Sequence, residues 1–308
     1  MSGDRLGVRW GYAGGAALAS IEQARDAARF AERAGFDSFW ISHALGIHPI
    51  VALACVGPEV PGLKELGTSV VPLFGRHPID LAQASLTAQS ALNGRFTLGI
   101  GAGSKPQAEE RMALSWDRPF SFTREFVDAL EPLLTGREAD IDGEQLSAHA
   151  QLGIAAPAPP ILVAALGRRM LRFAGARTQG TSLGQCGPNT IANYIVPTLR
   201  AGAEAVGRPM PRIMALVRIC VTNDPVGAYA LAKEVSAFYH AFPSYAAVLD
   251  KEGLDHPADL HLIGSWQAIL DGLAKYAESG VTDLRIEIAA HNADARVATR
   301  EALANYLR

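Results

Sequence analysis

The sequence contains 308 residues, with 28 lysines and arginines against 31 aspartates and glutamates, so the formal net charge is −3. This near balance gives no electrostatic reason to expect nucleic acid or an anionic membrane as a partner. Hydrophobic residues make up 49% of the chain and charged residues 19%. A disordered protein is therefore excluded, because enough apolar surface is available to offset the entropy of ordering.

The three cysteines, Cys55, Cys186 and Cys220, are far apart and form no CxxC motif, which argues against a disulfide framework or a thiolate zinc site. The histidines show no HxH or HExxH spacing, so no metal is expected. The amino terminus has no apolar run of signal-peptide length, and no later segment is long and apolar enough for a membrane span. We therefore expect a cytoplasmic protein that acts on a small molecule.

Apolar runs with strand character alternate with helical patterns along the whole chain. Strands are expected at 6–10, 36–41, 66–73, 96–100, 161–165, 180–184, 213–222 and 281–289. Helices are expected at 20–34, 78–92, 123–135, 168–177, 188–206, 265–279 and 294–307. The segments at about 136–160 and 224–264 are interpreted as insertions in a single domain, 1–308.

About eight continuous apolar strands, each followed by a helix, are typical of parallel strands buried on both faces. This count favours an α/β fold of the (β/α)8 TIM barrel type, with insertions, over an open doubly wound sheet. In such a barrel the active site lies at the carboxyl ends of the strands. Polar or small residues follow the expected strands at Tyr12, Ser42 and His43, Ser69 and Val70, 101–104, 165–169 and 181–185.

His43 directly follows an apolar strand and is the one candidate catalytic residue. A histidine in this place can be a general acid near neutral pH, or it can be a hydrogen-bonded wall of the pocket. The residues alone leave both interpretations open.

Two strand-to-helix turns are rich in small or basic residues. The run 98–104 (LGIGAGS) can expose backbone N–H groups to a phosphate or let a flat ring lie against the main chain, but it can also be an ordinary tight turn. The spacing GxGxxG of dinucleotide-binding loops is not met, because Pro106 takes the third position. Arg168 and Arg169 open a helix, where the dipole disfavours cations; either an anion neutralises them or they form a solvated face.

Several segments resemble the bacterial luciferase-like superfamily. They are AERAGFDSFWISH, LGTSVVPLFGRHPIDLAQASLTAQSALNGRFTLGIGAGS, TREFVDALEPLLTG, PPILVAALG and YAESGVTDLRI. Within it, the chain is most similar to oxidoreductases dependent on the deazaflavin coenzyme F420, such as methylene-tetrahydromethanopterin reductase and F420-dependent glucose-6-phosphate dehydrogenase. The motifs GTSVxP and GRFxLGxGxG are specific to the superfamily but separate F420 from FMN less well.

The resemblance implies a site that holds F420. It implies a non-prolyl cis peptide between Ser69 and Val70 that supports the deazaflavin ring, and it places His43 beside the reactive carbon of that ring. The further cofactor-binding positions that it implies are Ser42, Gly101, Ala102, Gly103 and Gln107, together with Leu166, Gly167, Arg169 and Met170, which would hold the F420 phosphate.

The chain also departs from the sugar-phosphate enzymes of the family. Ser104 replaces a glutamate assigned to proton transfer there, and Gly187 replaces the lysine that binds the substrate phosphate. A sugar phosphate is therefore not expected. The aromatic residues Trp10, Tyr12 and Phe74, if they lie near the mouth of the barrel, favour an uncharged organic acceptor, although each can equally belong to the core.

The resemblance thus implies an oxidoreductase in which hydride passes between C5 of reduced F420 and a C=C, C=N or C=O bond, with His43 or water supplying the proton. One alternative is an FMN-dependent luciferase-like monooxygenase on the same fold. The other is a flavin- or deazaflavin-binding protein without catalytic activity. Members of the family often form homodimers, so a homodimer is expected.

Overall fold

The computed structural model describes residues 5–308 and divides into two compact units. Unit 1 consists of the described part of Met1–Ala13 together with Phe30–Phe39 and Ala165–Arg308. Unit 2 consists of Gly14–Arg29 and Trp40–Ala164. Helix α1 (Ile21–Ala34) and strand β2 (Ser38–Ile41) contribute residues to both units. The organisation of 1–308 as a single domain stays a prediction.

Helix α1 begins and ends where the sequence predicts. The hydroxyl of Ser20 accepts a hydrogen bond from the Gln23 amide at 3.2 Å, and the Gln23 side chain accepts one from the Ala19 amide, which satisfies backbone donors at the helix start. Gly35 ends the helix with φ +92°. A Cβ atom there would lie 2.8 Å from the carbonyl oxygen of Leu307, so only glycine fits.

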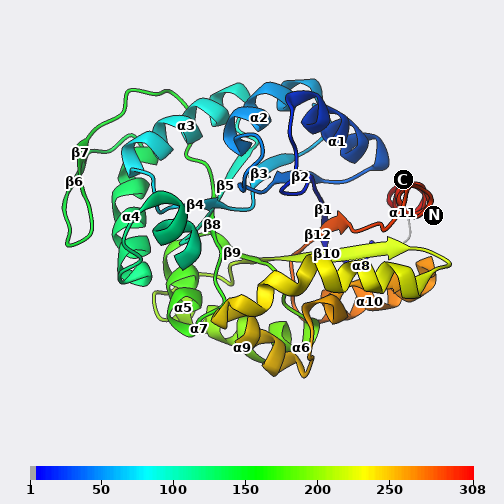
Figure 1. Cartoon of the computed structure of the whole chain (residues 1–308). Coiled ribbons are helices and arrows are strands. Elements are labelled where there is room, and N and C mark those ends of the chain that lie inside the picture. The colour runs from blue at the N-terminus through cyan, green and yellow to red at the C-terminus, as the bar shows by residue number, and fades with distance from the viewer. Residues whose placement is uncertain (1–4) are drawn as a thin grey trace. The chain divides into compact units, whose positions relative to one another are not determined.

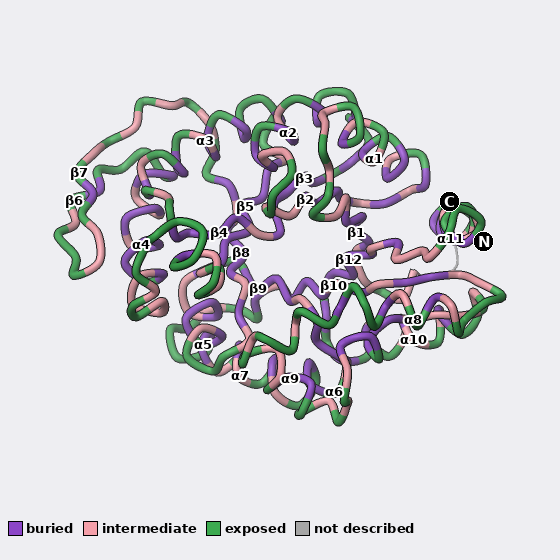
Figure 2. The backbone as a smooth tube through the Cα atoms, viewed as in Figure 1, coloured by how far each residue is buried: buried purple, intermediate pink, exposed green. Residues whose placement is uncertain are grey.

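Unit 2 is built on short parallel strands that are buried along their length (Figure 2). The strands are arranged in the order β2-β3-β5-β8, and β4 also pairs with β5. Its elements, besides parts of α1 and β2, are α2 (Pro49–Val56), β3 (Glu65–Thr68), β4 (Val71–Pro72), α3 (Pro78–Ala91), β5 (Phe96–Gly101), α4 (Pro119–Leu134), β6 (Ala139–Asp142), β7 (Ser147–Ala150) and β8 (Ile161–Val163).

Two features of unit 2 differ from the sequence-based expectation. The single strand expected at 66–73 is two strands, β3 and β4, separated by Ser69 and Val70. The segment of helix α2 was not expected to be helical; the helix packs on β3 and against α3 (Figure 1). Its residues are apolar almost all round, so the 3.6-residue periodicity that marks an amphipathic helix is absent.

The segment 136–160 contains an antiparallel hairpin, β6 paired with β7. Nε2 of His77, at the start of α3, lies 2.9 Å from the carbonyl oxygen of Ser147 and ties the hairpin to the unit. His149 on β7 contacts the carboxylates of Asp140 and Asp142 on β6, which raise the pKa of its imidazole. This hairpin is a separate two-stranded sheet outside the parallel one.

Unit 1 has the parallel strand order β9-β10-β12-β1, with β11 paired to β10. Helices α5 and α7 pack side by side, and α11 packs on β10 and β12. Its elements, besides parts of α1 and β2, are β1 (Arg9–Ala13), α5 (Arg168–Arg177), β9 (Gly180–Leu183), α6 (Pro188–Thr190), α7 (Val196–Glu204), β10 (Arg212–Val221), α8 (Pro225–Ser236), α9 (Pro243–Glu252), β11 (Leu262–Gly264), α10 (Trp266–Glu278), β12 (Asp283–Ile288) and α11 (Ala293–Leu307).

The aromatic residues of β1 belong to the core of unit 1. Trp10 is fully buried and packs on Tyr306 of α11, with ring centroids 5.4 Å apart. Tyr12 packs edge-on against Phe30 of α1 at 5.1 Å. Of the two interpretations left open for Trp10 and Tyr12, the structure favours the core: both fill the layer between strand and helices.

The insert at 224–264 forms α8, the 3-10 turn η4 (Ala237–Ala241), α9 and β11. Tyr239 and Tyr245 from this insert pack together with ring centroids 4.8 Å apart. Over residues 5–308, no helix combines the length and the apolar character that crossing a membrane requires.

Candidate active site

The carboxyl ends of β2 and β3 are joined through Ser69 and Val70. The peptide bond between these two residues is cis, as the family resemblance implies. The hydroxyl of Ser42 donates to the carbonyl oxygen of Ser69 at 2.7 Å, and the backbone amide of His43 donates to that of Val70 at 3.4 Å. The structure therefore brings four of the expected site residues together.

His43 is held by a residue that the sequence analysis did not single out. A terminal nitrogen of the Arg76 guanidinium lies 2.7 Å from Nδ1 of His43. A guanidinium can only donate, so Nδ1 accepts and the proton of the neutral ring resides on Nε2. Arg76 is itself oriented, because its Nε donates to the carbonyl oxygen of Pro72 at 3.1 Å.

The surroundings of His43 keep its imidazole neutral. Burial and the positive charges of Arg76 and His48 lower its pKa to about 4. His48 packs edge-on against it with ring centroids 5.0 Å apart, and burial also lowers the pKa of His48. An imidazole with such a pKa is almost wholly uncharged near neutral pH. His43 can therefore act as a hydrogen-bond donor through Nε2, but near neutral pH almost none of it is present as the imidazolium ion.

Glycines at the end of β5 let its buried backbone lie close to neighbouring residues. A Cβ atom on Gly99 would lie 1.9 Å from the carbonyl oxygen of Thr68, and one on Gly101 would lie 2.9 Å from Cγ2 of Val70. The hydroxyl of Thr68 bridges the two strands, donating to the carbonyl oxygen of Gly99 and accepting from its amide. Val70 therefore borders both His43 and the glycine-lined strand end.

The loop after β5 turns at once into a helix. Gly103 has φ +90° and lies close to the Gln107 side chain, while Ala102 is half-buried. The hydroxyl of Ser104 accepts from the Gln107 amide at 3.4 Å, and its carbonyl oxygen accepts from the Ala108 amide. Ser104 thus caps this short helix, and no carboxylate takes its place in this turn.

Phe74 is a buried residue of unit 2. Its ring packs against Trp116 and Phe122 at centroid distances of 4.5 and 4.4 Å. Next to it, Met112 and Leu114 are exposed and border Gly75. Of the three aromatic candidates for the mouth, Phe74 alone lies close in sequence to Arg76.

Four expected cofactor residues lie at the start of α5 in unit 1. Gly167 is the N-cap residue, and no heavy atom lies within 4 Å of the position that its Cβ would take. Leu166 and Met170 are half-buried and Arg169 is exposed. The first turn of α5 has no acidic residue, so its amides and Arg169 are suited to an anion.

The turn after β9 is occupied by a carboxylate side chain of the same chain, that of Glu252. The Glu252 carboxylate accepts from the backbone amides of Asn189 and Thr190 at 3.1 and 2.7 Å. A Cβ atom on Gly187 would lie 2.2 Å from the carboxyl carbon of Glu252, so glycine makes room for it. Gly187, which replaces the phosphate-binding lysine of the sugar-phosphate enzymes, thus lies against a carboxylate.

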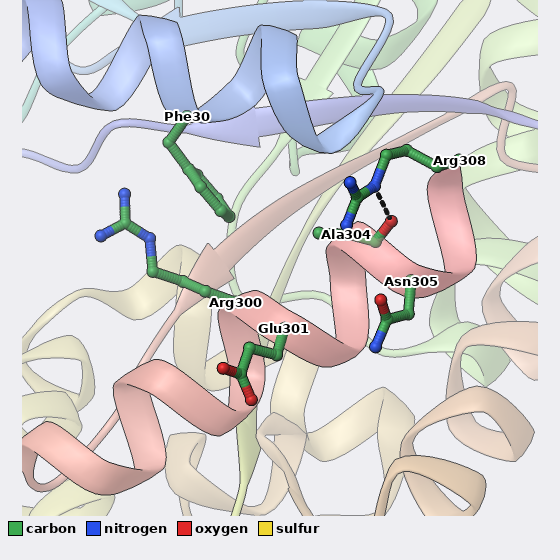
Figure 3. A pocket seen from close by; sticks show the side chains of 6 residues that line it. All are labelled: Phe30, Arg300, Glu301, Ala304, Asn305 and Arg308. Atoms are coloured by element: carbon green, nitrogen blue, oxygen red, sulfur yellow. Dashed lines mark hydrogen bonds between the residues drawn. The ribbon is translucent and has the colours of Figure 1, made fainter.

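An open groove of ≈ 470 Å³ lies elsewhere in unit 1, along the end of α11 (Figure 3). It is lined by Phe30, Arg300, Glu301, Ala304, Asn305 and Arg308, and the Arg300 guanidinium lies 4.0 Å from the centre of the Phe30 ring. The neighbouring Tyr306 contacts Trp10, near the start of β1, and Leu307 lies against Gly35, which precedes β2. The groove therefore lies at the amino ends of the strands and not at the catalytic end.

Arg76, His48 and Glu252 are the site residues that the sequence reasoning missed. Arg76 and His48 lie in loops that follow β4 and β2, so the rule that strand ends carry function could have included them. Glu252 closes a helix in the insert, 62 positions after Thr190. No local pattern indicates that contact.

The chain was compared with known proteins. Residues 6–283 match the family model described as luciferase-like monooxygenase. The F420-dependent glucose-6-phosphate dehydrogenase of Nakamurella multipartita is 28% identical over 296 residues, which cover 91% of this chain and 86% of that protein.

Two solved structures with under 20% identity show the same fold. An F420-dependent secondary alcohol dehydrogenase in complex with an F420-acetone adduct superposes with a TM-score of 0.81, covering 98% of this chain and 99% of the other. The oxygenating constituent of 3,6-diketocamphane monooxygenase from Pseudomonas putida, in complex with FMN, gives 0.75 and covers 96% of each. The expected luciferase-like (β/α)8 TIM barrel is thereby confirmed.

Proposed function

Because this chain belongs to the luciferase-like monooxygenase family, we propose that it is an F420-dependent oxidoreductase that transfers hydride between deazaflavin C5 and an uncharged organic acceptor. The acceptor bond is C=C, C=N or C=O. A sequence relative and a structural relative, both named as F420-dependent dehydrogenases, support this choice. When bound, F420 supplies the hydride chemistry, and the protein supplies orientation and a dry pocket.

The residues present fit a flat cofactor. In unit 2, Gly101 packs against Val70 and Ala164 with no room for a side chain, so the strand end next to the cis bond of Ser69 and Val70 stays narrow enough for a flat ring to lie beside it. In unit 1, the start of α5 offers backbone amides and an arginine to a phosphate. The proposed cofactor-binding residues are Ser42, Ser69, Val70, Gly101, Ala102, Gly103 and Gln107 in unit 2, and Leu166, Gly167, Arg169 and Met170 in unit 1.

The Arg76–His43 contact is the observation that carries the proposed chemistry. When hydride reaches the acceptor carbon, the π electrons move to the partner atom, which becomes negative and then takes a proton. Nε2–H of His43 donates a hydrogen bond to that atom, and the cation of Arg76 behind the ring stabilises its charge. Water then supplies the proton, because His43 is neutral near pH 7.

Glu252 supports an acceptor without a phosphate or carboxylate group. Its carboxylate already occupies the backbone amides at the start of α6. A second anion at this turn would be repelled by Glu252 and would find those amides engaged. An uncharged acceptor meets neither obstacle.

Titration of the purified protein with oxidised F420 and, separately, with FMN tests the cofactor assignment by fluorescence. F420 binding with weak or no FMN binding is expected. Tight FMN binding without F420 binding would instead support the FMN-dependent monooxygenase. Loss of absorbance of reduced F420 with enones, quinones or imines then tests the reaction, and silence with every acceptor would favour a non-catalytic binding protein.

A further inference from the structure

Gln185 lies two residues after the end of β9 and combines two unfavourable features. Its side chain is buried, with 4% of the residue exposed, and its backbone has φ +48°. Residues other than glycine rarely adopt this left-handed region, although asparagine does so more readily than glutamine. Both features lie at the carboxyl end of a strand, where enzymes of this fold place their functional residues.

The amide nitrogen of Gln185 is enclosed and, within residues 5–308, has no hydrogen-bond acceptor. A buried donor without a partner is destabilising, because it loses its bonds to water and gains none in return. Gln89 in unit 2 shows the ordinary case. It is 2% exposed, and its side-chain oxygen accepts from the Phe96 amide at 2.7 Å.

A second neutral donor lies at the same turn. A Cβ atom on Gly184 would lie 3.4 Å from the hydroxyl oxygen of Tyr245, so this hydroxyl borders the backbone next to Gln185. Burial raises the pKa of Tyr245 to about 12, which keeps the hydroxyl protonated. An amide N–H and a phenol O–H that border the same turn suit a neutral oxygen acceptor such as a carbonyl.

We propose that the Gln185 side chain binds the carbonyl oxygen of the organic acceptor. This inference rests on the proposed function, and it assigns Gln185 to substrate binding while the cofactor is held by other residues. A ligand oxygen supplies the partner that the amide lacks. The unfavourable conformation is then retained for binding, since residues kept for function are often those that reduce stability.

The test compares Gln185→Met with the matched variant Gln89→Met, because methionine keeps the volume and removes the amide. The probe is cyclohex-2-enone, titrated calorimetrically into the protein loaded with oxidised F420, and thermal unfolding is measured for each protein. We expect Gln185→Met to unfold at or above the wild-type temperature and to bind the probe about 3- to 10-fold more weakly. Gln89→Met should unfold about 2 to 4 °C lower, with probe binding unchanged.

Each other outcome overturns the inference. Unchanged probe binding in Gln185→Met, no binding of the probe by the wild type, or a stability loss like that of Gln89→Met would each leave Gln185 without the proposed role. Weaker F420 binding in Gln185→Met, with probe binding intact, would assign the residue to the cofactor. Failure of the proposed function is a separate result, because it would be seen as absence of F420 binding by the wild type.

Discussion

The guanidinium of Arg76 lies 2.7 Å from Nδ1 of His43, which joins two basic side chains by a hydrogen bond. Such a contact is favourable only when the imidazole is neutral, since an imidazolium would place two cations side by side. It fixes the proton on Nε2, which lies farther from the same guanidinium nitrogen, at 3.5 Å. The chemistry of the site follows from this pair.

Substitution His43→Ala should lower turnover by about 10- to 100-fold and leave F420 affinity within a few-fold, because it removes one hydrogen bond to the developing negative charge. Steady-state kinetics and fluorescence titration measure the two effects. His77→Ala is the control, because His77 caps α3 with no proposed role in the reaction. Wild-type turnover in His43→Ala would remove the residue from the mechanism.

The plot of kcat/KM against pH should show no change in slope near pH 6.5 from the titration of His43. Burial and Arg76 lower the pKa of this residue to about 4, so the neutral form persists until the solution approaches that pH. Activity should therefore be flat through neutral pH and fall only in acid, as His43 gains a proton and its Nδ1 no longer accepts from Arg76. A limb near 6.5 that disappears in His43→Ala would contradict this assignment.

Substitution Arg76→Met should raise the pKa of His43 toward its ordinary value, because a repelling cation is removed while the burial of the imidazole stays. Titration of the His43 ring signals by NMR measures the shift directly. Turnover should fall by about 10-fold, since the ring loses its orientation and the charge behind it. Arg76→Lys retains a cation but not the planar fork, and an intermediate effect is expected. A His43 pKa unchanged in Arg76→Met would show that burial alone sets it.

Folding stability should decrease in mild acid. The folded pKa of His43 is about 4 and that of His261 about 3, because burial and nearby positive charge lower both below the ordinary value of 6.5. The unfolded chain therefore binds more protons than the folded chain below 6.5. The stability from the neutral histidines is present above pH 6.5 and is lost as the pH falls toward 4. Urea unfolding across this range should show a steeper pH dependence for wild type than for His43→Gln.

The strand ends were predictable from the sequence because continuous apolar runs stop at polar or glycine residues. Ser42, His43 and the glycines of β5 all follow this pattern. The direction of side chains within a strand was not predictable in the same way. Both faces of a parallel strand are buried, so the pattern of β1 does not distinguish Trp10 and Tyr12 in the helix-facing layer from residues that face the site.

Contacts between distant loops were beyond the reach of local patterns. Arg76 reaches His43 across 33 positions and Glu252 reaches Thr190 across 62. Each contact depends on the folded path of the chain and not on residue spacing. The cis bond at Ser69 and Val70 was expected through family resemblance, since no physical feature of the residues Ser and Val predicts it.

Substitution Glu252→Gln should destabilise the protein by about 1 kcal/mol, because a neutral amide replaces the carboxylate that accepts two backbone amides at a helix start. Urea unfolding measures the loss. Glu234→Gln, at an exposed position of α8, is the neutral control. Inorganic phosphate should raise the unfolding temperature of neither the wild type nor Glu234→Gln. A clear rise in the wild-type unfolding temperature with phosphate would contradict the argument for an uncharged acceptor, if a substitution that fills the turn at Asn189 and Thr190 abolishes it.

Substitution Gly101→Ala should weaken F420 binding by about 10-fold or more. The added methyl group would lie 2.9 Å from Cγ2 of Val70 and 3.2 Å from Cβ of Ala164, so it must push outward into the surface that the ring is proposed to use. The cost in stability should be about 1 to 3 kcal/mol, as for other overpacked sites. Gly153→Ala is the control, because no atom lies within 4 Å of its added methyl. If Gly101→Ala binds F420 as tightly as the wild type, the end of β5 does not hold the deazaflavin.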